Sequence, residues 1–271
     1  MAAVASQLPL YAICDLLGVP AADRAQLLAW TNALTVPTEP EYAPSEEEFT
    51  AAVNGIWNYG TLLADMRRRD PGRDVMSTIV AAANEDRLSD DEVMGFMLTL
   101  AAAGNETTRH VISHGLLALL HHPDQLGWLR ARADAIPATA VEEILRWSSP
   151  VIHSRRTVVH DVGIHGVKLV AGDAVVVLYP AANFDPRQFP DPRCFDLQRQ
   201  PNLHLVFATG PHLCLGAHVA RLETRILFEE LLQRAGHIEL DGRCEYLRDN
   251  ALRGIKRLPI LMTRPTQATH G

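Results

Sequence analysis

The sequence predicts a mainly α-helical protein with a small β region. Three observations support this fold class: helical periodicity over most of the chain, one helical segment long enough to cross a domain, and short alternating stretches that cluster in the second half. The candidate helices are Leu8–Leu17, Ala21–Leu34, Ser45–Arg69, Val75–Ala83, Ser89–Leu120, Pro123–Ala133, Ala138–Trp147 and Leu215–Arg234.

A break rich in proline and glutamate, Val36–Pro44, separates the second candidate helix from the third. Proline fixes its own φ and disfavours helical geometry at the residue before it, so we expect a loop there. Short strands are expected at Thr157–Val162 and Ala174–Leu178, where apolar and polar residues alternate, and again around Ile238 and Leu258–Met262.

The longest candidate helix covers about 89–120. It opens with Ser89-Asp-Asp-Glu92, a capping box, and ends at Pro123, which stops a helix. At 1.5 Å per residue such a helix is about 45 Å long. Residues Met94–Ala103 are apolar on every side, which predicts a buried helix. Gly104, Glu106 and Thr107 in its middle are costly there unless they serve a function.

Cys214 lies in the run Phe207-Ala-Thr-Gly-Pro-His-Leu-Cys-Leu-Gly216, directly before a helix. A helix N-terminus stabilises negative charge on sulfur and so favours the thiolate, the form that binds metals. Gly210 and Gly216 allow the backbone to approach a flat partner, and the ring N–H of His212 suits a carboxylate on that partner. The pattern predicts a cysteine-ligated planar metal cofactor such as haem. The alternative is a free cysteine that packs as a small hydrophobe.

This string and the Ala217-His-Val-Ala-Arg-Leu-Glu223 that follows it resemble the haem-binding loop and next helix of cytochrome P450. The resemblance implies haem b (iron protoporphyrin IX) with Cys214 as the iron ligand and Phe207, Gly210, His212 and Gly216 beside the cofactor. The family usually has glycine where this chain has Ala208. Alanine tolerates most backbone geometry except positive φ, so we expect some strain at that position.

The string Ala103-Gly-Asn-Glu-Thr-Thr108 resembles the centre of the family's long helix over the distal face of haem. The resemblance implies that Ala103 and Gly104 lie beside the cofactor. It also implies that Glu106 and Thr107 form an acid–alcohol pair that delivers protons for oxygen activation. The alternative is a tolerated glycine, with the Thr107 hydroxyl bonded to a carbonyl one turn earlier.

Glu143 and Arg146 are spaced so that both side chains share one helix face. The resemblance implies that this pair is buried and structural. The family completes it with a later arginine; Cys194 occupies that place in Pro192-Arg-Cys-Phe195, so Arg199 is the expected third member.

An arginine that pairs with a haem propionate is also implied by the resemblance. Its spacing to Asp161 assigns this role to Arg156, whose planar fork suits a carboxylate, and Arg155 is the alternative.

The chain has 271 residues, of which 47% are hydrophobic and 21% charged, and a net charge of −7, which argues against nucleic acid as a partner. We expect one cytochrome P450-like domain over 1–271. Relative to the family, the first third is absent, so the fold is expected to be N-terminally truncated. No apolar run reaches the length of a bilayer span, and the start lacks a basic signal region, so a cytoplasmic protein without membrane contact is expected.

The resemblance implies a haem-thiolate monooxygenase that inserts one oxygen atom of O2 into a small apolar substrate, of steroid, terpenoid or fatty type. Electrons would come from a ferredoxin with its reductase, and Arg221 or Arg225 is a candidate for its docking face. The alternative is a truncated haem-binding remnant without turnover. His110 and His114 have a zinc-compatible spacing, but no third ligand accompanies them.

Overall fold

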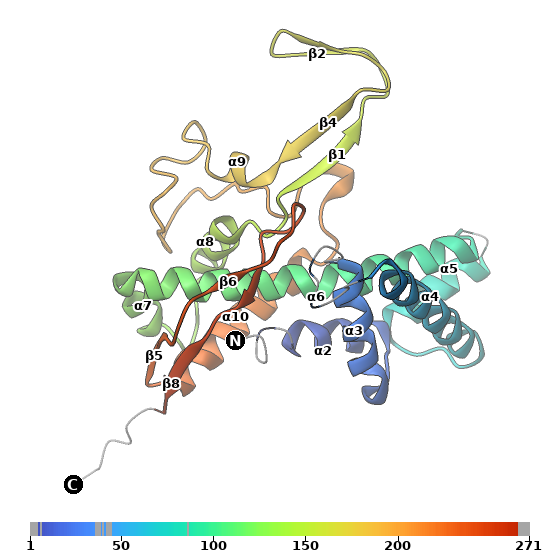
Figure 1. The fold of residues 1–271 in the computed structure, drawn as a ribbon, viewed down its shortest axis with the longest axis horizontal. Helices are drawn as coiled ribbons and strands as arrows, with labels where there is room; N and C mark the ends of the chain where they lie inside the picture. Colours follow the sequence, from blue (N-terminus) through green and yellow to red (C-terminus); the bar gives the residue numbers. More distant parts are fainter. Residues whose placement is uncertain are drawn as a thin grey trace.

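Helix α6, Asp90–His121, runs through the length of the molecule, and most other helices pack against it (Figure 1). Its first turn has the capping box that the sequence predicts, because Ser89 Oγ accepts from the Glu92 N–H and the Glu92 side chain accepts from the Ser89 N–H. The structure is a computed structural model that describes residues 5, 7–35, 39, 41, 45–85 and 87–264. Most of the Val36–Pro44 stretch lies outside these residues.

Four helices pack on the N-terminal half of α6 and share one apolar cluster with it. Leu17, Leu27, Leu63 and Met76, one from each of these helices, are buried in that cluster. The helices are α2 (Gln7–Leu17), α3 (Arg24–Thr35, after the 3₁₀ turn η1 at Ala21–Asp23), α4 (Glu46–Arg69) and α5 (Val75–Asn84).

A second cluster forms on the C-terminal half of α6. The helices that contribute to it are α7 (Pro123–Arg130), α8 (Ala138–Ser148) and α10 (Ala217–Arg234). The short helix α9 (Tyr179–Asn183) lies between α8 and α10 along the chain. Helix α10 begins two residues later than the sequence predicts, because Gly216 is its N-cap. Helix α9 is absent from the sequence prediction.

The strands of the described residues form four two-stranded antiparallel sheets, so the predicted mainly helical fold with a small β region is confirmed. The pairs are β1 (His153–Thr157) with β4 (Ala174–Leu178), β2 (Val162–Ile164) with β3 (Val167–Leu169), β5 (His237–Leu240) with β8 (Ile260–Thr263), and β6 (Glu245–Tyr246) with β7 (Ile255–Arg257). The β1–β4 pair projects from the helices and carries β2 and β3 at its tip (Figure 1).

The prediction of one strand at Thr157–Val162 is wrong, whereas Ala174–Leu178 is confirmed as β4. Strand β1 ends at Thr157, and one further pair of backbone contacts follows it: the Val158 N–H donates to the Asp173 carbonyl at 2.9 Å, and the Gly172 N–H donates to the Val158 carbonyl at 2.8 Å. The Asp161 carboxylate then accepts a hydrogen bond from the Ala171 N–H at 3.0 Å, which occupies the place of a ladder contact.

Gly115 is the point where α8 and α10 both come closest to α6. A Cβ atom at Gly115 would lie 2.6 Å from Ile144 Cγ2 and 3.0 Å from Phe228 Cζ. Gly95, on the same helix, would gain a Cβ with no heavy atom within 4 Å. The close packing of α8 and α10 on α6 therefore requires glycine at position 115, where the side chain is a single hydrogen atom.

We expect Gly115→Ala to lower the free energy of unfolding by about 1–3 kcal/mol, because the added methyl overpacks the crossing. Gly95→Ala is the matched control, and we expect it to raise the free energy of unfolding by about 0.5–1 kcal/mol through helix propensity alone. Urea unfolding followed by circular dichroism measures both. Equal effects of the two substitutions would contradict this account of the crossing.

Candidate functional site

The cysteine loop, residues 207–216, is held together by a backbone hydrogen bond and exposes the side chains around its cysteine. The Cys214 N–H donates to the Phe207 carbonyl at 2.9 Å, and the Phe207 side chain is buried. The Cys214 side chain is exposed, and its neighbours Leu213 and Leu215 are 61% and 75% exposed. The loop thus presents a thiol flanked by two apolar side chains, directly before the N-terminus of α10.

The glycines of this loop leave the space in front of it open. Gly210 has φ +63, in the region that favours glycine, and begins the 3₁₀ turn Gly210–His212, where His212 is exposed. Gly216 has an ordinary φ of −83, so the backbone itself does not require glycine there. A Cβ at either position would meet no atom within 4 Å. A flat, partly apolar group with a metal that accepts sulfur fits these residues.

Ala208 has φ +56, the left-handed conformation in which the sequence analysis expects strain. Its N–H donates to the Leu205 carbonyl at 3.0 Å, which holds the turn in that shape. A side chain in this region costs about 1–2 kcal/mol relative to a right-handed conformation.

Helix α6 is not buried on every side over Met94–Ala103, contrary to the sequence prediction. Phe96 is 39% exposed, Thr99 and Ala103 are exposed, and Thr107 is half-buried. The spacing of these residues places them in one row along the helix. The chain therefore leaves an open stripe of Phe96, Thr99, Ala103 and Thr107 on α6. The Thr107 hydroxyl donates to the Ala103 carbonyl at 2.8 Å within this stripe.

Gly104 lies on a different side of α6 from this stripe. A Cβ at Gly104 would lie 3.0 Å from both Cγ1 and Cδ1 of Ile13 on α2. The structure thus gives Gly104 a packing role, the close approach of α2 to α6. Ala103, its neighbour, is the member of the pair that faces open space.

Glu106 is buried and forms an ion pair with Arg109, one turn later on α6. Glu106 Oε2 also lies 3.4 Å from His110 Nε2. Glu106 Oε1 has no hydrogen-bond partner among the described residues. The carboxylate is therefore held at one oxygen and free at the other.

The neighbouring Thr108 contacts a second buried carboxyl group, Glu223 on α10. Burial raises the pKa of Glu223 from 4.5 to about 7, although the Thr108 hydrogen bond lowers it in part. Sequence analysis does not single out Glu223 as ionisable in the neutral range, because its environment depends on how α10 crosses α6.

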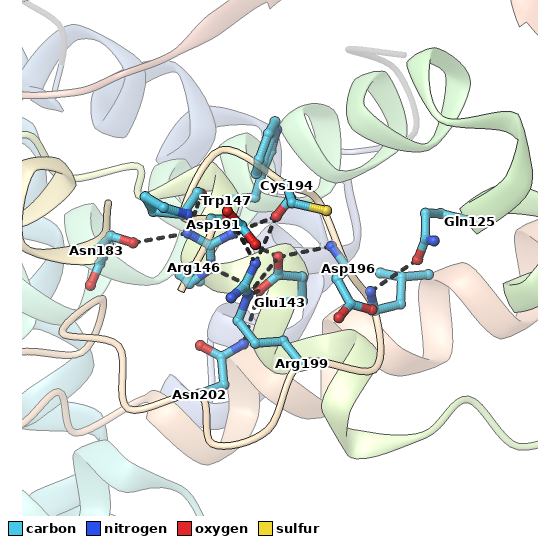
Figure 2. A network of polar contacts seen from close by, with 12 residues as sticks. Gln125, Glu143, Arg146, Trp147, Asn183, Asp191, Cys194, Asp196, Arg199 and Asn202 are labelled. Carbon is cyan, nitrogen blue, oxygen red and sulfur yellow. Dashed lines mark hydrogen bonds and ion pairs between the residues drawn. The ribbon is translucent and has the colours of Figure 1, made fainter. Parts of the chain in front are cut away.

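A buried ion cluster connects α8 to the segment that precedes the cysteine loop (Figure 2). Glu143 accepts two hydrogen bonds from Arg146, from Nε to Oε2 and from Nη2 to Oε1, both at 2.7 Å. Arg199 Nε lies 3.2 Å from Glu143 Oε2, and Asn202 Nδ2 donates to the same oxygen at 3.0 Å. The structure brings Glu143, Arg146 and Arg199 together.

The remaining guanidinium N–H groups of this cluster donate to backbone carbonyls. Arg146 Nη1 donates to Asn183 O at 2.9 Å, and Arg199 Nη1 donates to Pro190 O at 2.7 Å. Both arginines also donate to the carbonyl of Cys194, at 3.3 and 2.9 Å. Cys194 thus takes part through its backbone, and the place of the family's usual arginine is filled by Arg199.

Arg156 lies in β1 and is half-buried, whereas Arg155 is exposed. Arg156 Nη1 donates to Ser154 Oγ at 3.1 Å and to the Arg155 carbonyl at 2.9 Å. The candidate cofactor-binding residues therefore lie on three separate elements, which are the cysteine loop, α6 and β1.

Arg221 is a structural residue in the described part of the chain, which argues against the docking role considered for it. Arg221 Nε donates to Glu142 Oε1 at 2.6 Å, and its guanidinium lies 4.5 Å from the centre of the Phe207 ring. His204 Nε2 lies 2.9 Å from Glu142 Oε2. Burial alone would raise the pKa of Glu142, but its hydrogen bonds with His204 and Arg221 outweigh burial and lower it to about 2. No local sequence pattern indicates this cluster, because its members His204 and Arg221 lie 62 and 79 residues from Glu142.

His110 and His114 do not form a zinc site in the described residues, where no three His, Cys, Asp or Glu side chains group around a common point. His114 Nε2 instead contacts the Arg253 carbonyl at 3.0 Å. No helix in the described part of the chain is long and apolar enough to cross a bilayer.

The profile of the family described as Cytochrome P450 matches residues 61–131 and 138–252, more than half of the chain. The chain belongs to the cytochrome P450 family. Its fold, the cysteine loop before α10 and the Glu143–Arg146 pair stand in the order that the resemblance implies for a P450. These P450 features are distributed over α6, α8 and the segment up to α10.

Known P450 proteins resemble this chain over nearly its whole length. A methyl-branched lipid omega-hydroxylase of Mycobacterium tuberculosis is 41% identical over 259 residues, which covers 95% of this chain and 60% of that protein. A steroid C26-monooxygenase of Rhodococcus jostii is 40% identical, with coverages of 95% and 54%. A Mycobacterium marinum cytochrome P450 solved in complex with pseudoionone superposes with a TM-score of 0.88 at 38% identity, covering 94% of this chain and 63% of that chain. The chain spans about 60% of the length of the first of these relatives.

We expect Ala208→Gly to raise the free energy of unfolding by up to about 1 kcal/mol, because glycine adopts positive φ without strain. Ala131→Gly is the control, since Ala131 ends α7 at φ −65, and we expect it to lower stability by about 0.5–1 kcal/mol. Chemical denaturation measures both. A loss of stability in Ala208→Gly would show that the turn is not strained.

We expect Glu223 to make folding stability fall as pH rises through about 7. Its raised pKa means that the folded chain holds the proton more tightly, so the gain is full below pH 4.5 and is lost through pH 7. The change is on the order of 3 kcal/mol, and Glu223→Gln removes it. Unfolding at several pH values measures the slope. Glu230→Gln on the same helix is the matched control, because it makes the same change of side chain at a half-exposed position.

Proposed function

We propose that this chain binds haem b through Cys214 and acts as a haem-thiolate monooxygenase on a small apolar substrate. The observation that carries the proposal is the exposed Cys214 thiol at the start of α10, between two exposed leucines and two glycines with open space before them. When bound, the haem supplies oxygen activation, and thiolate donation favours O–O cleavage.

On the cysteine side, the chain's residues would hold and orient the cofactor. Leu213 and Leu215 would cover its face, and the N-terminus of α10 would stabilise the charge on sulfur. His212 and Arg156 have N–H groups suited to the propionates, although Arg156 must first give up its contact with Ser154.

On the opposite side, Glu106 and Thr107 would move protons. The Thr107 hydroxyl donates to the Ala103 carbonyl, so its oxygen keeps lone pairs that accept a hydrogen bond from water or an oxygen ligand. The free Oε1 of Glu106 is the atom that can take up and release a proton. Ala103 lies one turn before Thr107 in the α6 stripe, where its small, exposed side chain leaves room.

The α6 stripe of Phe96, Thr99 and Ala103 supports an apolar substrate of steroid, terpenoid or fatty type. Relatives named for methyl-branched lipids and for steroids favour the same class. The electron donor we propose is a ferredoxin with its reductase.

We expect the wild-type chain, expressed with a haem supply and reduced under carbon monoxide, to give the red-shifted Soret band of thiolate-ligated haem. Cys214→Ser should abolish that band because serine supplies no thiolate. Cys194→Ser is the matched control, since Cys194 is also exposed and its recorded hydrogen bonds are made by its backbone N–H and carbonyl. A wild-type chain without haem, or an unchanged band in Cys214→Ser, would refute the proposal.

A second candidate function is haem binding without turnover, which the exposure of Phe96 and Ala103 on α6 favours. Oxidation of a fatty acid or steroid with hydrogen peroxide as the oxidant separates the two. Product that depends on Cys214 supports the enzyme, whereas a haem-loaded chain that forms none supports the second candidate.

A further inference from the structure

Two buried residues that follow the Ala103–Thr108 string contact Glu106. Arg109 forms the ion pair with Glu106, and His110 Nε2 lies 3.4 Å from Glu106 Oε2, within ion-pair distance but longer than an ordinary N–H···O hydrogen bond. All three side chains are almost fully buried. Both contacts reach the same carboxylate, so its position depends on residues one turn further along α6.

The tautomer of His110 is set from the other side of the ring. The Ile255 N–H donates to His110 Nδ1 at 3.3 Å. A ring nitrogen that accepts an N–H carries no proton, so the proton of the neutral imidazole lies on Nε2, the atom that faces Glu106. Among the described residues Nε2 makes no hydrogen bond, and Glu106 Oε2 at 3.4 Å is the polar atom that it faces.

The 253–255 segment also covers the imidazole. A Cβ at Gly254 would lie 2.8 Å from both Nε2 and Cε1 of His110, so only glycine allows this approach. One turn along α6, His114 Nε2 contacts the Arg253 carbonyl at 3.0 Å. Two histidines of α6 therefore hold the same short segment.

His110 stays neutral in this environment. Burial lowers its pKa, and the positive charge of Arg109 lowers it further. The negative charges of Glu106 and Asp249 oppose this shift but do not outweigh burial. The ring therefore acts as a fixed donor at Nε2 and a fixed acceptor at Nδ1.

We infer that His110 is a positioning residue for Glu106, held in its donor tautomer by the backbone of Ile255. The clamp of Arg109 and His110 occupies Glu106 Oε2 and leaves Oε1 as the oxygen that exchanges a proton. This inference rests on the proposed role of Glu106 in proton delivery. It links that role to the 253–255 segment, more than a hundred residues away in sequence.

Two substitutions separate the two functions of the imidazole. His110→Asn keeps an oxygen near the place of Nδ1, which accepts from Ile255, but removes the donor to Glu106. His110→Gln places an amide N–H near Nε2, which donates to Glu106, but removes the acceptor for Ile255. Thermal unfolding of both variants first establishes that each is folded at the temperature of measurement.

The first readouts need no haem. In the wild-type chain, ¹⁵N imidazole spectra should show His110 as the Nε2–H tautomer between pH 6 and 8. Exchange of the Ile255 amide proton should speed up roughly tenfold in His110→Gln, the factor for about 1.4 kcal/mol, and stay near the wild-type rate in His110→Asn. The ¹³C carboxylate signal of Glu106, assigned with Glu106→Gln, should move in His110→Asn and stay in His110→Gln.

The haem-loaded enzyme provides the last readout, the division of electrons between product and hydrogen peroxide. Peroxide release should rise several-fold in His110→Asn and stay at the wild-type level in His110→Gln. An Nδ1–H tautomer, or parallel losses in both variants, would overturn the inference. A wild-type chain that takes up no haem would refute the proposed function, while the tautomer, exchange and carboxylate readouts would still decide the clamp.

Discussion

The position of the cysteine loop depends on the buried ion cluster around Glu143. A buried carboxylate and two buried guanidinium groups lose much of their hydration, and mutual attraction alone does not always offset that loss. Here the backbone carbonyls of 183, 190, 192 and 194 accept the remaining guanidinium N–H groups, so the charges are paired and hydrogen-bonded. Asn183 extends the arrangement, since its Oδ1 accepts from the Leu205 N–H at 2.7 Å, two residues before the loop begins.

Helix α6 combines tasks that the sequence presents as one motif. Neighbouring residues point to different partners: Ala103 to open space, Gly104 to α2, and Glu106 to a buried clamp. An α-helix has 3.6 residues per turn, so adjacent residues necessarily face different sides of it. The string Ala103–Thr108 therefore combines packing residues with residues suited to chemistry.

The fold class and the boundaries of the long helix could be predicted from the sequence because they rest on local signals, the capping box at Ser89 and the proline at 123. The strand at Thr157–Val162 could not, because regular pairing ends after Val158 and the Asp161 side chain bonds to the Ala171 N–H of the opposite chain. Burial of Met94–Ala103 was overestimated, since an apolar composition does not reveal which face lacks a protein partner. Contacts of Glu142, Glu223 and His110 with residues distant in sequence leave no local pattern.

The Glu143 cluster also has a consequence for the order of folding. Its contacts to Asp196, Arg199 and Asn202 span 53, 56 and 59 residues, whereas the helices around α6 form from contacts within a turn. Closing long loops costs chain entropy before the contacts form, and chains rich in distant contacts fold slowly. We expect the helices to form first and the segment that carries Cys214 to take its shape late. In a newly made chain the helices would therefore form while the segment that carries Cys214 is still unstructured.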